Sequence, residues 1–326
     1  MANTVGLLGG GYLSGHLAQR LRKDGCNVRV FSRRECPAVP GVHYCRGSIE
    51  DQAAVGQWLR GCDELFYLAH DAKISPFRDS DQFALVHNLD LFVRTLATAA
   101  AQGVSRILLV SSGGAVYGRT NGNRSWREDD APAPVSAYGL AKLTMEHYLR
   151  MFCAERGTRF LILRPSNPYG PGQTGGHNQG VISIFLRRVL AGQPLEIWGS
   201  EAISKDYIYI DDFTAAVSEL VRAGYDNLCY NVSSGQPTSL RQIVDAIGDT
   251  IGARPEILFR PARANDVPVV LVDPTRLQSR VPWTPQVSLA QGVAATWEWI
   301  RRQSPAEPEA RGPDCSPTRS TVTLPS

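Results

Sequence analysis

A tyrosine and a lysine at a spacing of four, Tyr138 and Lys142, are the residues of this chain best suited by type and position to catalysis. On a helix that spacing places the phenol and the ammonium on one face, one turn apart. A free tyrosine has a pKa near ~10 and is a poor base at neutral pH. A nearby ammonium, helped by the positive charge of an oxidised nicotinamide, favours the phenolate. The phenolate can accept a hydroxyl proton while the neighbouring carbon releases a hydride, and the reverse reaction reduces a carbonyl.

The position of this pair favours catalysis over an exposed helical pair. Its helix runs from Ser136 to about Phe152 and follows the apolar run Ile107–Val110, which ends in two hydroxyls, Ser111 and Ser112. Ligands bind at the carboxyl ends of the strands in an open parallel sheet. We therefore expect Ser111 to contact a cofactor at this edge.

A glycine loop near the N-terminus predicts a dinucleotide-binding turn. Gly9 and Gly11 would let the backbone approach a pyrophosphate, and Ser14 stands where a third glycine is usual. The helix that starts around Tyr12 and Leu13 would offer N–H groups and a positive dipole end to the phosphates. A glycine cluster alone also fits a plain turn, but a strand precedes it and a helix follows it, which favours cofactor binding.

The end of the second expected strand bears on the choice between NAD and NADP. An acidic residue there would bind the ribose 2′-hydroxyl of NAD. This chain has Ser32, Arg33 and Arg34 instead, which suit the 2′-phosphate of NADP. We favour NADP; if the two arginines are only a solvated surface pair, the cofactor is NAD.

Short apolar runs alternate with helical patterns through the first half of the chain. This alternation predicts an α/β fold with a Rossmann-type doubly wound parallel sheet and a smaller α/β substrate lobe. We expect a dinucleotide-binding domain over 1–165, a substrate lobe interleaved with returning sheet elements over 166–303, and a disordered tail over 304–326. The expected strands are Val5–Leu8, Val28–Phe31, Glu64–Ala69, Arg106–Val110, Arg159–Leu163, Leu195–Trp198 and Asp206–Ile210. The expected helices lie near 14–24, 51–60, 82–101, 136–152 and 181–191.

Composition excludes several classes of protein. A net charge of +3 over 326 residues is too small to indicate nucleic acid or an acidic membrane surface as a partner. The seven cysteines are irregularly spaced, which favours reduced thiols in a cytoplasm. We see neither a secretory signal nor an apolar run of about 18 residues that could span a bilayer. The six histidines show no metal-ligand spacing, so we expect no metal.

The chain resembles the extended short-chain dehydrogenase/reductases, specifically the nucleotide-sugar epimerase/dehydratase family, in the order of these features along the sequence. The resemblance runs from about Thr4 to Arg301. It is carried by an ordered set of motifs: the glycine loop, Ser111-Ser112-Gly113-Gly114-Ala115-Val116-Tyr117-Gly118, Tyr138 with Lys142, Arg164-Pro165-Ser166-Asn167-Pro168-Tyr169-Gly170-Pro171-Gly172, and Lys205-Asp206-Tyr207-Ile208-Tyr209-Ile210-Asp211-Asp212.

The resemblance implies a role for particular residues. Tyr138 would be the general base and acid, and Lys142 would bind the nicotinamide ribose and lower the tyrosine pKa. The resemblance also implies Leu68 and Ala69 along the cofactor groove, Asn88 as a structural asparagine of the core, Asn167 at the sugar nucleotide, and Lys205 and Arg263 at the substrate diphosphate.

Two departures from the family pattern affect these roles. The usual catalytic serine or threonine, three residues before Val116, is Gly113 here. Either Ser112 or a water would then have to hydrogen-bond the reacting oxygen. Lys205 replaces the usual arginine, which keeps the charge but loses the bidentate fork.

The resemblance leads to two enzymatic hypotheses and one of another class. The leading one is a nucleotide-sugar epimerase that acts at C4 through a transient 4-keto sugar. The alternative is an NADPH-dependent nucleotide 4-ketosugar reductase, which the cluster at Ser32 favours. A dehydratase is disfavoured, because Gly114 and Ala115 replace its Asp-Glu pair. The third hypothesis, a non-catalytic dinucleotide sensor, has only Gly113 in its support. The family also implies a homodimer, formed where the helix at 86–101 packs beside the Tyr–Lys helix.

Overall fold

The computed structural model describes residues 2–36, 38–69, 79–118, 124–174, 180–262 and 269–303; for 79–84 it describes the backbone alone. Two predictions concern residues outside these ranges, namely the diphosphate contact of Arg263 and the disordered tail at 304–326.

A seven-stranded sheet in the order β10-β6-β5-β4-β1-β2-β3 forms the centre of the molecule. Every neighbouring pair in it is parallel. From β1 the chain builds outward through β2 and β3 and then returns to add β4, β5, β6 and β10 on the other side, so the strand order reverses between β1 and β4. This order confirms the predicted Rossmann-type doubly wound sheet. The strands are β1 (Thr4–Leu8), β2 (Asn27–Ser32), β3 (His43–Arg46), β4 (Glu64–Tyr67), β5 (Arg106–Val110), β6 (Arg159–Pro165) and β10 (Leu228–Val232).

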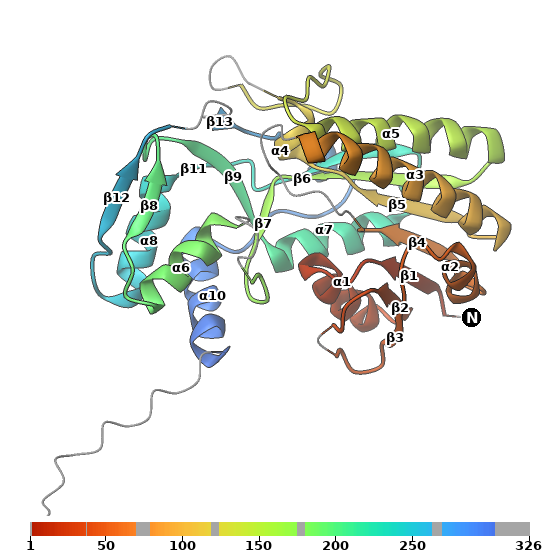
Figure 1. The fold of residues 1–326 in the computed structure, drawn as a ribbon, viewed down its shortest axis with the longest axis horizontal. Helices are drawn as coiled ribbons and strands as arrows, with labels where there is room; N and C mark the ends of the chain where they lie inside the picture. Colours follow the sequence, from red (N-terminus) through yellow and green to blue (C-terminus); the bar gives the residue numbers. More distant parts are fainter. Residues whose placement is uncertain are drawn as a thin grey trace, which may run out of the picture.

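Helices cover both faces of the sheet because its central strands are apolar on both sides (Figure 1). Along β5, Leu108 and Val110 belong to one core cluster, and Ile107 and Leu109 to the other, as the two-residue period of a strand requires. α1 and α7 cover the first face, and α2, α3 and α5 the second. Their bounds are α1 (Tyr12–Lys23), α2 (Gln52–Leu59), α3 (Asp79–Ala101), α5 (Ala137–Arg156) and α7 (Ile210–Ala223).

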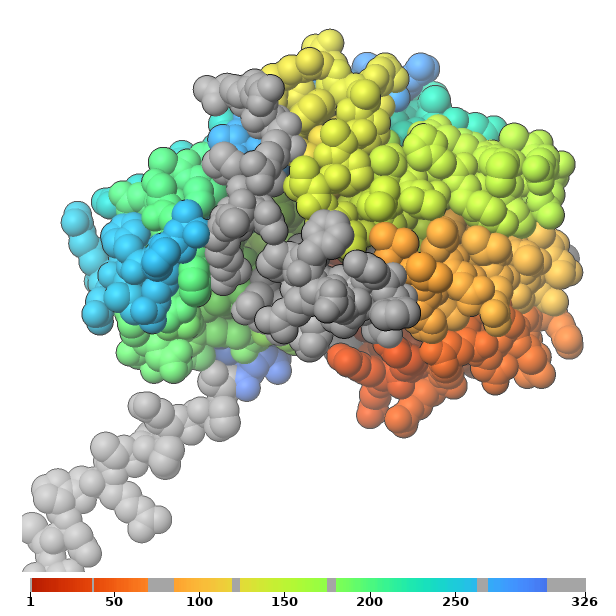
Figure 2. Space-filling model, turned by 45° about the horizontal axis from the view of Figure 1, so that its top comes forward, coloured from red at the N-terminus to blue at the C-terminus, as the bar shows by residue number. Residues whose placement is uncertain are grey.

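Most of the remaining elements gather at one end of the sheet, and Figure 2 shows their green and cyan residues on the side opposite the red N-terminal strands. The short helices α4 and α9 instead pack beside the sheet, α4 against α5 and β6, and α9 against β10. β9 pairs with β7, β11 and β13, while β8 and β12 form a separate parallel pair. The first core cluster continues into this region through Ile182, Ile243 and Ile300, so both parts share apolar packing. The elements are α4 (Gly113–Val116), β7 (Asn167–Tyr169), α6 (Val181–Leu190), β8 (Leu195–Trp198), β9 (Ser204–Tyr209), β11 (Pro237–Ser239), α8 (Leu240–Ile251), β12 (Ile257–Arg260), β13 (Val269–Val270), α9 (Thr275–Gln278) and α10 (Leu289–Gln303).

The elements that were expected are present and differ from the observed ones mainly at their ends. The expected strand at 64–69 ends at Tyr67, and the strand expected over 206–210 is β9, after which α7 begins at Ile210. Several observed elements were not predicted, namely β10 of the central sheet, the short strands β7, β11, β12 and β13, and the helices α4, α7, α8, α9 and α10. β3 was not predicted either. It is a half-exposed edge strand without a buried apolar run, so its residues carry little strand signal.

Candidate active site

The Tyr–Lys helix begins beside the end of β5. Ser136 caps α5 by accepting a hydrogen bond from Gly139 N at 3.1 Å. Gly139 allows close packing here, because a Cβ at this position would lie 2.3 Å from the carbonyl oxygen of Ala115. The first two turns of α5 are therefore held against the short helix α4, which directly follows β5.

Tyr138, Lys142 and Ser112 meet at this point. Lys142 Nζ donates a hydrogen bond of 2.9 Å to the carbonyl oxygen of Val110, the last residue of β5. The same Nζ lies 5.9 Å from the ring centroid of Tyr138. Ser112 makes a side-chain hydrogen bond with Tyr138. The structure thus brings all three predicted catalytic residues to the carboxyl edge of the sheet.

Burial in the protein disfavours the charged forms of both Tyr138 and Lys142. Burial raises the pKa of Tyr138 to about 12, and the hydrogen bond with Ser112 acts in the opposite direction. Burial lowers the pKa of Lys142 to about 8, and the charge of Glu146 opposes it. The protein groups alone therefore leave the pKa of Tyr138 above its ordinary value, because desolvation outweighs the hydrogen bond with Ser112.

Gly113 leaves Ser112 as the hydroxyl at this site. A Cβ at Gly113 would lie 3.0 Å from the carbonyl oxygen of Arg164 and 3.1 Å from that of Pro165, so the end of β6 packs directly on its backbone. Ser112 is only partly buried and reaches Tyr138 from the preceding position. Of the two alternatives for the missing hydroxyl, the geometry favours Ser112.

The glycine loop lies where the strand order reverses. Gly9 has a φ of +116°, which favours glycine, and a Cβ there would lie 3.1 Å from the backbone nitrogen of Ala69. The loop therefore packs against Leu68 and Ala69, which follow β4. α1 begins at Tyr12 with Gly11 as its N-cap, and no side chain caps it. Its first N–H groups stand at the edge where a pyrophosphate would bind.

The residues after β2 flank the same loop. A Cβ at Gly10 would lie 2.3 Å from Ser32 Oγ and 2.2 Å from Cys36 Sγ, so both side chains lie directly against the loop. Arg33 and Arg34 are exposed, and Arg34 N donates to Ser32 Oγ at 3.2 Å. Cys36 was not predicted here. Its only sequence signal is that it follows the ribose-binding position by four residues.

Asn167 and Lys205, two of the predicted substrate residues, lie on two paired strands. Asn167 on β7 donates through Nδ2 to the carbonyl oxygen of Asp206 on β9 at 2.6 Å, next to Lys205. The Asp206 side chain is fully buried and accepts hydrogen bonds from Ser234 N at 2.9 Å and Gly235 N at 2.8 Å. Asp206 was not predicted as a site residue, although a carboxylate within an apolar strand indicates a buried hydrogen-bond acceptor. Asn88 is buried in α3, as its expected structural role requires.

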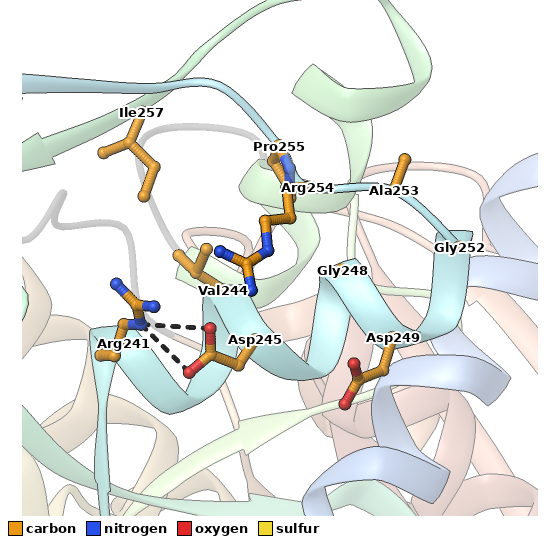
Figure 3. Close-up of a pocket in the computed structure, with 10 residues that line it drawn as sticks. All are labelled: Arg241, Val244, Asp245, Gly248, Asp249, Gly252, Ala253, Arg254, Pro255 and Ile257. Atoms are coloured by element: carbon orange, nitrogen blue, oxygen red, sulfur yellow. Dashed lines mark hydrogen bonds and ion pairs between the residues drawn. The ribbon is translucent and has the colours of Figure 1, made fainter.

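An open groove of about 840 Å³ lies elsewhere, along α8 and the segment that leads into β12 (Figure 3). Across its floor Arg241 Nε donates to both carboxylate oxygens of Asp245 at 3.1 Å. The lining contains none of the residues described above. It consists of Arg241, Val244, Asp245, Gly248, Asp249, Gly252, Ala253, Arg254, Pro255 and Ile257.

Metal-binding groups of side chains and membrane-spanning helices are both absent from the described ranges. Groups of three or more His, Cys, Asp or Glu side chains that could hold a metal ion do not occur among these residues. Within the same ranges, every helix is too short or too polar to cross a membrane.

A doubly wound parallel sheet, a glycine loop at its switch point and a Tyr–Lys pair at the same edge define a dinucleotide-dependent class of enzyme. The chain belongs to the NAD dependent epimerase/dehydratase family, whose model matches residues 6–233.

The named relatives include epimerases and reductases. The chain is 31% identical over 307 residues to a UDP-glucose 4-epimerase of Mycolicibacterium smegmatis, covering 90% of this chain and 97% of the relative. It is 34% identical over 200 residues to a dTDP-4-dehydro-6-deoxyglucose reductase of Escherichia coli, covering 61% and 62%. Among solved structures, a Thermus thermophilus UDP-glucose 4-epimerase in complex with NAD has a TM-score of 0.84 at 26% identity, covering 92% of this chain and 100% of that one.

Proposed function

We propose that this protein is an NAD(P)-dependent nucleotide-sugar 4-epimerase that acts through a transient 4-keto sugar. The observation that carries the proposal is the meeting of Tyr138, Lys142 and Ser112 at the same edge of the sheet as the glycine loop. The similarity to the M. smegmatis UDP-glucose 4-epimerase, over nearly the whole of both chains, supports it.

The residues of the glycine loop fit a dinucleotide. No described heavy atom other than its chain neighbours lies within 4 Å of the point that a Cβ at Gly11 would occupy, so the loop is open on that side. Gly9, Gly11, Tyr12 and Leu13 would hold the pyrophosphate, and Leu68, Ala69 and Ser111 would line the groove towards the nicotinamide. When bound, the nicotinamide supplies a hydride acceptor and donor.

Chain residues then handle the proton and the orientation of the sugar. Tyr138 removes the proton of the 4-hydroxyl and later returns a proton to the 4-keto oxygen. Ser112 hydrogen-bonds the Tyr138 oxygen and the reacting oxygen beside it. Lys142, fixed by Val110, holds a positive charge close to the phenol and favours its ionised form. Asn167 and Lys205 would bind the sugar nucleotide, with Arg263 as a further diphosphate contact.

The test is turnover of UDP-glucose to its C4 epimer, followed by separation of the two sugar nucleotides. Tyr138→Phe should lower kcat by at least about 100-fold, because a general acid–base group contributes about 10²–10⁴-fold. Tyr148→Phe, the same change on the same helix, is the matched control and should keep wild-type turnover. Unchanged turnover in Tyr138→Phe would contradict the catalytic assignment of Tyr138. A wild-type protein that binds the dinucleotide but turns over no nucleotide sugar would favour a non-catalytic dinucleotide sensor.

A second candidate function is an NADPH-dependent nucleotide 4-ketosugar reductase. It is supported by the 34% identity to the E. coli reductase and by Ser32 and Arg33 at the ribose position. Mass analysis of cofactor released from purified protein separates the two. Tightly retained NAD favours the epimerase. A site that binds NADPH reversibly, with oxidation of NADPH by dTDP-4-dehydro-6-deoxyglucose, favours the reductase.

We also propose that the protein is a cytoplasmic homodimer. α3 and α5 lie side by side (Figure 1) and expose large apolar side chains: Val86 on α3 is 65% exposed, and Leu140 and Met151 on α5 are 48% and 53% exposed. Such side chains on adjacent helices suit a helix–helix interface between two copies. The six cysteines within the described residues are unpaired, which suits a reducing compartment. Sedimentation of the purified chain tests the dimer.

A further inference from the structure

A buried ion pair lies one turn beyond the Tyr–Lys pair and joins α5 to β6. Glu146 and Arg164 are 1% and 4% exposed. Arg164 donates from Nε to Glu146 Oε1 at 3.0 Å and from Nη2 to Oε2 at 2.6 Å, and Ser111 Oγ also donates to Oε1. Arg164 Nη1 donates to the Tyr117 hydroxyl at 2.9 Å, which donates to Asn231 Oδ1 at 2.7 Å. The carboxylate is therefore fixed in position by three donors and is part of a longer buried hydrogen-bond network.

This carboxylate belongs to a regular set of contacts between β5 and α5. The last residue of β5 and the two residues after it each contact a different turn of the helix. Since the helix residues are spaced by four, they share one face. The contacts are Ser112 with Tyr138, Val110 with Lys142, and Ser111 with Glu146.

Charge gives Glu146 a second effect on the site. Lys142 is 3% exposed, and burial lowers its pKa to about 8, close enough to neutrality for the ammonium to be lost under mildly alkaline conditions. Glu146, one helical turn away, raises that pKa and so opposes the burial. An ammonium at Lys142 is what the proposed function requires beside Tyr138.

We propose that Glu146 is a positioning residue of the active site: it holds the end of β5 against α5 and supplies the negative charge that favours the ammonium form of Lys142. Arg164 fixes this carboxylate in place. The proposal deepens the proposed function and rests on it for the importance of Lys142, but the charge relation itself can be tested without any substrate.

The other titratable groups on the elements around Lys142 do not supply such a charge. Within the described residues, α5 contributes Tyr138, the segment after α4 contributes Tyr117, and β10 contributes Cys229. Burial raises the pKa of each of these three groups, so they stay neutral. On α3, Asp90 and Arg94 pair with each other at the surface at 2.9 Å. Arg164 on β6 is positively charged, so its charge disfavours the ammonium form of Lys142.

The experiment is an NMR titration of the folded protein with isotope-labelled lysine side chains. The chain has four lysines, and a Lys142→Met sample assigns the Lys142 signal. Glu146→Gln should lower the pH midpoint of Lys142 by about 1–2 units, the effect of one unit charge about one helical turn away at an effective dielectric constant near 20. Arg164→Met, which leaves Glu146 unneutralised, should raise the midpoint.

Opposite shifts in the two variants separate a charge effect from general damage, because both changes break the same ion pair. Glu155→Gln, an exposed glutamate on the same helix, is the matched control and should leave the midpoint unchanged. If Glu146→Gln does not fold, the double variant Glu146→Gln/Arg164→Met replaces the pair by neutral groups and should still lower the midpoint. Unchanged midpoints, or shifts in the same direction in both single variants, would overturn the proposal. Turnover retained by Tyr138→Phe would overturn the proposed function and leave this titration result intact.

Discussion

Removal of the Ser112 hydroxyl tests whether this residue replaces the serine or threonine that is usual at position 113, where this chain has Gly113. Ser112→Ala removes the hydrogen bond to Tyr138 and little else, because Ser112 is only partly buried. A hydrogen bond to a group that carries charge during the reaction contributes about 1.5–3 kcal/mol. At about 1.4 kcal/mol for each factor of ten, kcat should fall about 10–150-fold.

The pH dependence should change in a defined direction. The hydrogen bond opposes the burial that raises the pKa of Tyr138 to about 12, so its loss raises this pKa further. In Ser112→Ala, the rising limb of kcat against pH should therefore move to higher pH. The assay is epimerisation of UDP-glucose across pH, with thermal unfolding to show that the variant is folded. Ser105→Ala, at the opposite end of β5, is the control.

A kcat and a pH profile equal to those of the wild type would refute this reasoning. Such a result would mean that the Ser112–Tyr138 contact is structural, and that a water replaces the side chain missing at Gly113.

Three further outcomes follow from buried or exposed charges elsewhere. Burial raises the pKa of Asp206 from 3.8 to about 6, so the protonated carboxyl stabilises the fold below the unfolded pKa, and this stabilisation is lost as the pH rises through the folded pKa. In urea unfolding, the free energy of unfolding of the wild type should therefore exceed that of Asp206→Asn by about 1 kcal/mol more at pH 5 than at pH 7.5. An equal difference at both pH values would contradict this. Glu64→Ala removes a 4% exposed partner of Arg106, which keeps Asp226 as a second partner, and should cost about 2 kcal/mol in unfolding free energy. Asp90→Ala at a surface pair should cost under about 1 kcal/mol. Arg33→Ala should lower the ratio of NADP to NAD affinity about tenfold in calorimetric titrations, and an unchanged ratio would assign the cofactor site to NAD.

The elements that carry the site were predictable because their signals are local. The spacing of Tyr138 and Lys142 suffices to place them on one helical face, and Gly9 and Gly11 mark a tight turn by residue type alone. The alternation of apolar strands and helices suffices for the doubly wound sheet. β3 escaped prediction, because an edge strand that is half-exposed lacks the apolar run that marks β5.

Contacts between distant residues were beyond local patterns. Glu146 pairs with Arg164 and Ser111, which lie 18 and 35 positions away, and no spacing rule connects them. The direction of each pKa shift likewise depends on how much water the packed elements remove. The sequence by itself therefore determined which chemistry is available, namely a phenol and an amine one turn apart beside a cofactor loop. Only the tertiary structure decided that burial disfavours charge on both groups, and that Ser112 and Glu146 are the residues that oppose it, because desolvation and contact exist only once β5, β6 and α5 have packed together.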